Sequence, residues 1–83
     1  MFITAEISYY PLTNEYSKAI DLFIEKLAIP GISIKSGTMS TLLTGEFHDV
    51  MDVIKKATEE LMKIHPSVFN IKISNACPVR EKQ

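Results

Sequence analysis

The sequence predicts an α+β domain whose elements follow the order β-α-β-β-α-β. Two observations lead to this order. Four short segments alternate between apolar and polar residues, which is the period of a half-buried strand, and two longer segments repeat apolar residues every three or four positions, as an amphipathic helix does. Proline and glycine interrupt the pattern between most of these segments.

The first strand and the first helix lie in the N-terminal third. Residues 2–10 alternate strictly, and Pro11 ends the strand because it has no amide to give to a sheet. Thr13 or Asn14 is expected to cap the helix that follows, with a side-chain oxygen on its first free amides. An apolar stripe then indicates a helix over residues 16–28.

A hairpin is expected in the middle of the chain. Pro30-Gly31 ends the helix, and residues 31–35 form a short second strand. Ser36-Gly37 is expected to be a tight turn, which makes the third strand, over residues 38–46, antiparallel to the second. This third strand carries four hydroxyl groups, at Thr38, Ser40, Thr41 and Thr44.

The C-terminal half predicts a helix and a fourth strand. The helix starts near His48 and ends before Pro66. Residues 68–76 alternate again, Cys77-Pro78 closes the strand, and residues 79–83 form a charged tail that we expect to fray. The apolar stripe of the helix consists of Val50, Met51, Ile54, Ala57, Leu61 and Met62.

Two β-α-β halves that meet at a hairpin are typical of the ferredoxin-like split β-α-β unit. We therefore expect residues 1–83 to form one domain, with a four-stranded antiparallel sheet and two helices on one of its faces. A chain of this length buries a modest core, which favours assembly into a homodimer or homotetramer.

Composition excludes several classes of function. The net charge is −1, with nine basic and ten acidic residues interleaved, so no basic field for nucleic acid exists. No apolar run approaches the roughly 18 residues that span a bilayer, and Glu6 interrupts the N-terminal apolar segment, so neither membrane insertion nor a secretion signal is expected. A single cysteine, Cys77, cannot form an internal disulfide. We expect a cytoplasmic protein.

Hydroxyl groups in a half-covered strand need hydrogen-bond partners, and a small polar ligand could supply them. Two plainer interpretations stay open: threonine favours strands for packing alone, and Glu6 could pair with Lys72 across the sheet. The residues selected as candidate ligand contacts are Glu6, Ser8, Tyr10, Ser40, Thr41, Asn70 and Ser74.

The sequence gives no basis for catalysis. His48 and His65 lie at opposite ends of the second helix, and neither has a carboxylate or cysteine at ligand spacing. His65 is best explained as a favourable partner for the negative end of the helix dipole. We therefore expect no catalytic residue, no metal ligand and no cofactor, and a binding protein that is not an enzyme.

The sheet face opposite the helices is expected to be polar with a few large side chains. Leu42 and Tyr10 on that face are large enough to need cover, and a second copy could stack on it. An alternative function follows: a regulatory or assembly module that oligomerises through this open face without a small-molecule ligand.

Three short motifs resemble a known family. Ser8-Tyr9-Tyr10-Pro11-Leu12, Ser40-Thr41-Leu42-Leu43 with Gly45, and Cys77-Pro78 are similar in order and spacing to a domain of the YkoF-like proteins, and so is the helix from Val50 to Lys56. These proteins bind thiamine and its hydroxymethylpyrimidine moiety in bacterial thiamine salvage.

The resemblance implies a ferredoxin-like domain that binds the pyrimidine part of thiamine without chemistry, in vitamin salvage, transport or sensing. YkoF carries two such domains in tandem, whereas this chain carries one, so a homodimer could rebuild the pair. The resemblance carries over Ser8, Tyr10, Ser40 and Thr41 as ligand-site positions.

Overall fold

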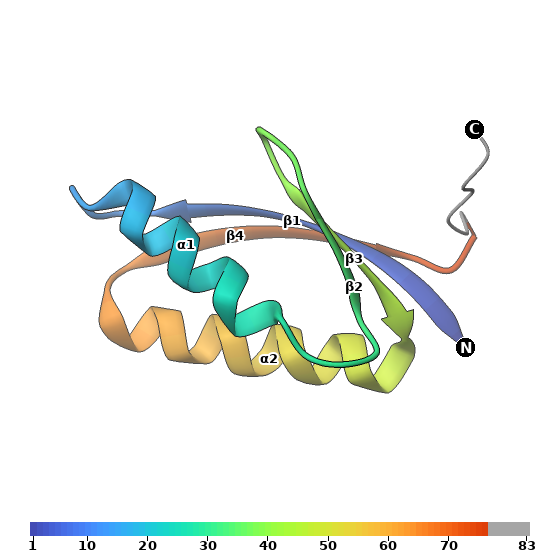
Figure 1. Ribbon diagram of the computed structural model, residues 1–83. Coiled ribbons are helices and arrows are strands. Elements are labelled where there is room, and N and C mark those ends of the chain that lie inside the picture. Colours follow the sequence, from blue (N-terminus) through green and yellow to red (C-terminus); the bar gives the residue numbers. More distant parts are fainter. Residues whose placement is uncertain (77–83) are drawn as a thin grey trace.

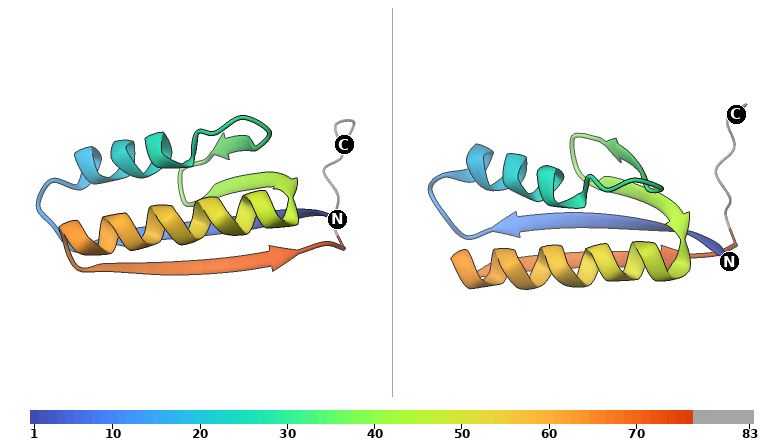
Figure 2. Two further views of the ribbon diagram at one scale, coloured as in Figure 1. Left: turned by 90° about the horizontal axis from the view of Figure 1, so that it is seen from below. Right: turned by 60° about the horizontal axis from the view of Figure 1, so that its bottom comes forward.

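The computed structural model describes residues 1–76 and has the predicted order of elements (Figure 1). The elements are β1 (Phe2–Pro11), α1 (Tyr16–Leu27), β2 (Ser33–Ser36), β3 (Thr41–Glu46), α2 (Phe47–Ile64) and β4 (Ser67–Ser74). The strands form one antiparallel sheet in the order β2-β3-β1-β4, and both helices cover the same face (Figure 2). The ferredoxin-like α+β fold is confirmed, while Cys77-Pro78 and residues 79–83 lie outside the described residues.

Strand β1 supplies the centre of the core. Its alternate side chains Ile3, Ala5, Ile7 and Tyr9 are buried beneath the helices, as the period-two pattern predicts. From α2 the buried residues are Val50, Val53, Ile54, Ala57 and Leu61. The predicted stripe was wrong at two residues. It left out Val53, which is buried, and it included Met62, which is 54% exposed. The stripe lies nearer to α1 than the sequence indicated.

The β2–β3 hairpin turns two residues later than predicted. The ladder continues through Ser36 opposite Thr41, and the Gly37 amide donates to the Ser40 carbonyl at 2.8 Å, which leaves Thr38 and Met39 at the tip. The tight turn predicted at Ser36-Gly37 and the strand start predicted at residue 38 were therefore wrong. The observed register places Ile34 beside the fully buried Leu43, which favours it over the predicted one.

The two helices begin differently. Helix α1 has Glu15 at its N-cap with no side-chain cap, so the predicted cap at Thr13 or Asn14 was wrong; instead the Glu15 amide donates to Thr13 Oγ1 at 3.2 Å. Helix α2 follows β3 without a loop. Its N-cap Glu46 accepts a hydrogen bond from the His48 amide at 2.9 Å, which stabilises this abrupt change from strand to helix.

An ion pair links the two helices. Lys26 Nζ lies 2.7 Å from Glu60 Oε1, and this hydrogen bond and the lysine charge lower the pKa of the Glu60 carboxyl. Among residues 1–76, no helix is both long enough and apolar enough to cross a bilayer.

Adjacent residues of α2 test the packing. Leu61 is fully buried, whereas Met62 is more than half exposed. We expect Leu61→Ala to lower the free energy of unfolding by about 2–5 kcal/mol, because it removes buried methyl groups and leaves a cavity. Met62→Ala should cost less than about 1 kcal/mol. Urea denaturation of both variants measures this, and equal losses would contradict the packing described.

Candidate functional site

The candidate contacts selected from the sequence lie on two different faces of the sheet. Thr41 pairs with the buried Ile7 and lies on the helix side, where it is 6% exposed. The remaining strand residues of the set lie on the open side of β1 and β4, and these are Glu6, Ser8, Tyr10, Asn70 and Ser74. The sequence thus selected two groups of residues that the sheet separates.

Glu6 holds a small polar network on the open face. Its Oε2 accepts a hydrogen bond from the Ser40 hydroxyl at 2.9 Å, and its Oε1 lies 3.9 Å from Lys72 Nζ on the neighbouring strand. The pairing of Glu6 with Lys72, one of the two plainer interpretations, is therefore present. Ser40 and Glu6 are already occupied with protein partners on this face.

A cavity of about 130 Å³ lies on the helix side, between α1, β1 and the tip of the β2–β3 hairpin. Three aromatic rings, from Tyr9, Tyr16 and Phe23, contribute to its wall, and none of the described residues that line it carries a charge. Tyr16 and Met39 are exposed residues, so the cavity reaches solvent between α1 and the hairpin tip. The other lining residues are Ile7, Ile20, Gly37, Thr38, Ser40 and Thr41.

Thr41 lines this cavity and is 6% exposed. Among residues 1–76, no hydrogen bond from the Thr41 hydroxyl to the protein is found. No fully enclosed side-chain oxygen or nitrogen lacks a partner within the same residues, so the Thr41 hydroxyl keeps some accessible surface, and Thr41 is one of the residues that line the cavity. A hydroxyl that is largely shielded from water and has no protein partner among these residues favours a guest that can donate a hydrogen bond to it or accept one from it.

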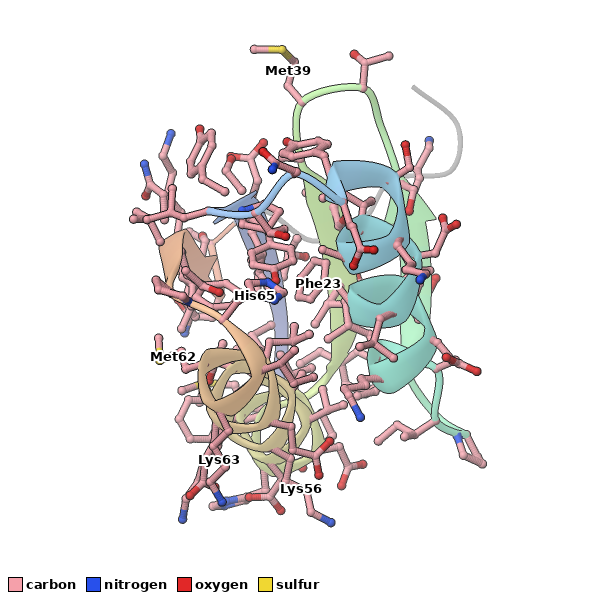
Figure 3. The ribbon with its side chains drawn as sticks, turned by 90° about the vertical axis from the view of Figure 1, so that its left-hand side faces the viewer. Phe23, Met39, Lys56, Met62, Lys63 and His65 are labelled. Carbon is pink, nitrogen blue, oxygen red and sulfur yellow. The ribbon has the colours of Figure 1, made fainter. Side chains whose placement is uncertain are left out.

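The inner wall of the cavity is held rigidly by Tyr9. Its ring stacks on Phe69 with a centroid distance of 4.6 Å and an interplanar angle of 5°, and it lies 5.0 Å from the ring of Phe23. A hydrogen bond of 2.7 Å joins the Tyr9 hydroxyl to His65 Nε2. Figure 3 shows Phe23 and His65 both directed into the interior between the helices and the sheet.

His65 has a structural role that the sequence did not reveal. It follows α2 as the C-cap residue, as its predicted place at the helix end requires, but its ring is bound to a tyrosine 56 positions away. No local pattern carries such a contact. Tyr9, Tyr16 and Phe23 were also missed as cavity residues, because each reads as ordinary core or helix-stripe sequence.

A wider groove of about 350 Å³ runs between the end of α1 and α2. Charged side chains of both signs surround it, from Lys26, Asp49, Asp52, Lys56 and Glu60. Figure 3 shows Lys56 on the outer side of α2, away from the sheet. Within residues 1–76 no three His, Cys, Asp or Glu side chains gather as a metal site would require.

Comparison with known proteins identifies relatives. The family model described as thiamine-binding protein matches residues 5–77. A candidate thiamine biosynthesis or salvage protein of Thermotoga maritima is 26% identical, with a TM-score of 0.77 over 89% of this chain and 83% of that one. A domain of unknown function from Bacillus cereus is 27% identical, with a TM-score of 0.78 over 99% of this chain and 86% of that one.

A protein of Streptococcus pneumoniae is 25% identical, with a TM-score of 0.80 over 89% of this chain and 86% of that one. No curated protein matches the chain by sequence.

The hydrogen bond between Tyr9 and His65 can be tested by removing one hydroxyl. We expect Tyr9→Phe to lower the free energy of unfolding by about 0.5–1.5 kcal/mol, because the ring stack is kept and His65 loses its partner. The matched control is Tyr10→Phe on the open face, which should change stability by less than about 0.5 kcal/mol. Chemical denaturation compares the two, and equal effects would show that the Tyr9 hydroxyl contributes nothing.

Proposed function

The chain belongs to the YkoF-like family of thiamine-binding proteins, and we propose that it binds thiamine or its hydroxymethylpyrimidine moiety. In this proposal the protein is a single domain that acts in the cytoplasm, in salvage, transport or sensing of the vitamin. It performs no chemistry on the ligand. The observation that carries the proposal is the Thr41 hydroxyl, which faces an aromatic-lined cavity without a protein partner among the described residues.

The size of the cavity suits one six-membered ring. A cavity of about 150 Å³ in another protein accepts benzene, and this one measures about 130 Å³. The pyrimidine of the ligand would fit between the rings of Tyr9, Tyr16 and Phe23. The thiazolium ring would then lie at the mouth, where the exposed Tyr16 ring can interact with its positive charge.

The polar groups of the cavity suit an aminopyrimidine. Such a ring carries an amine that donates and nitrogens that accept, and a threonine or serine hydroxyl can serve either. Thr41 supplies one hydroxyl from the cavity wall, and Thr38 lies at the hairpin tip. Of the candidate contacts selected from the sequence, Thr41 and Ser40 line this cavity. Ser8, Tyr10, Asn70 and Ser74 lie across the sheet from it, so we do not propose them as contacts of this ligand.

A thermal-shift measurement tests this site. Thiamine or hydroxymethylpyrimidine at a hundredfold excess over its Kd should stabilise the folded protein by about 2.7 kcal/mol, which raises Tm by several degrees in a domain of this size. We expect Thr41→Val to lose most of this shift, because valine keeps the branched shape and removes the hydroxyl. Thr44→Val, on the open side of the same strand, should keep it. A full shift in Thr41→Val would overturn the proposed site.

We also propose that the protein self-associates through its open sheet face. Leu42 and Tyr10 are exposed there, and Val68 lies directly opposite Tyr10 on β4. Covering this apolar surface with a second copy would remove it from water. A homodimer, or a homotetramer if a second surface also pairs, would follow.

Leu42→Glu tests the open face. The variant places a charge in the proposed contact, so we expect it to weaken association while the monomer stays folded, as measured by sedimentation and circular dichroism. The control Ser17→Glu adds the same charge to the exposed surface of α1. Identical sedimentation of Leu42→Glu and the parent would exclude this face as the contact.

A further inference from the structure

The tip of the β2–β3 hairpin is a weakly supported part of the cavity wall. The ladder between the two strands ends where Ser36 lies opposite Thr41. Beyond it, within residues 1–76, one backbone hydrogen bond closes the turn, from the Gly37 amide to the Ser40 carbonyl at 2.8 Å. Figure 1 shows the tip, which carries Met39, standing away from both helices. A turn held in this way can change its backbone angles without disturbing the sheet below it.

Two exposed apolar side chains border the mouth of the cavity. Met39 lines the cavity although it is 83% exposed, and Figure 3 shows it at the end of the hairpin, directed away from Phe23 and the interior. Tyr16, in the first turn of α1, is 51% exposed and lines the same cavity. Neighbouring apolar side chains that stay uncovered at the rim of a pocket are typical of a surface that a ligand covers.

The strands below the tip are fixed. The Ser40 hydroxyl donates to Glu6 Oε2 at 2.9 Å on the open face, and Thr41 is buried on the helix side. Any movement of the tip is therefore confined to residues 37–39. Gly37 suits a hinge at the start of this segment, because glycine adopts a wider range of backbone angles than other residues do.

We propose that the tip closes over a bound guest, and that Met39 and Tyr16 then hold between them the part of the guest that emerges from the cavity. The proposal rests on the proposed function, in which the pyrimidine fills the cavity and a second, cationic ring lies at its mouth. In the closed form the Met39 thioether lies on one face of that second ring and the Tyr16 ring on the other. The site is then selective for a flat second ring, and not for a pyrimidine alone.

The methionine side chain suits this role. It is unbranched and flexible, and its sulfur makes favourable contacts with aromatic rings at a distance of about 5 Å. Without a guest, closure gains little, because the tip would cover an empty cavity. With a guest in place, closure removes apolar surface of Met39, Tyr16 and the second ring from water together. The guest thus supplies the free-energy difference that favours the closed form.

NMR of the methionine methyl groups in the full chain tests the closure directly. With carbon-13 in these groups, thiamine should shift the Met39 signal upfield and give nuclear Overhauser contacts between this methyl group and the Tyr16 ring. Met62 is the matched control, because it is also exposed but does not line the cavity, and its signal should not move. Hydroxymethylpyrimidine, which lacks the second ring, should leave the Met39 signal nearly unchanged.

Dissociation rates give a second measurement. We expect Met39→Ala to raise the dissociation rate of thiamine about tenfold, because most differences in affinity between related sites lie in the rate of release. Met39→Leu keeps the apolar bulk and should restore most of this loss. Met62→Ala should leave the rate unchanged. Stopped-flow tyrosine fluorescence follows the rates, because two of the three tyrosines line the cavity.

Three results would overturn the clamp alone, provided that thiamine still gives the thermal shift that Thr41→Val removes. These are a Met39 signal that does not move when thiamine binds, equal thiamine dissociation rates in Met39→Ala and the parent, and an equal effect of Met39→Ala on thiamine and on hydroxymethylpyrimidine. A parent that shows no thermal shift with either compound would overturn the proposed function together with the clamp.

Discussion

The pairing of β1 with both of its neighbours is the constraint on which the rest of the structure depends. Strand β1 lies between β3 and β4, and every second side chain of its first nine residues is buried beneath the helices. Because side chains alternate with a period of two, this register decides the face of every residue on β3 and β4. It directs Thr41 into the cavity and leaves Glu6 on the open face with Lys72. A slip by one residue would exchange these groups and remove both the cavity and the core.

The two helices leave parts of the sheet incompletely covered, on both sides of the buried core. Helix α2 covers β1 but leaves Ile73 of β4 partly exposed at one edge. Helix α1 approaches the β2–β3 hairpin at the other side without closing on it, which leaves the cavity beside Tyr16. The cavity is suited to a guest of about one aromatic ring. The proposed ligand site lies on the helix side of the sheet, and the proposed assembly surface around Leu42 and Tyr10 lies on the other side.

The fold could be predicted from the sequence because local patterns of apolar and polar residues determine its elements. Much of the candidate site could not be predicted in this way. Alternation on β1 and the stripe of α2 give the elements and their faces. The turn was placed at Ser36-Gly37 because glycine favours turns, but burial of Leu43 beside Ile34 favours a register that ends at Thr38 and Met39. Ser40 and Thr41 were taken together as neighbours in sequence, although Ser40 bonds to Glu6 on the open face and Thr41 is buried on the other.

The contact between Tyr9 and His65 shows why the rest of the site escapes local reasoning, and also what it contributes. The two residues meet only because β1 and the end of α2 pack together, so no spacing rule connects them. Their hydrogen bond, with the stacked Phe69, fixes one wall of the cavity before any ligand arrives. The opposite wall is formed by exposed residues, including Met39 at the hairpin tip. A guest therefore loses little free energy in ordering the inner wall, and selectivity for its shape should arise there, while the outer wall can adapt to the part of the ligand that extends into water.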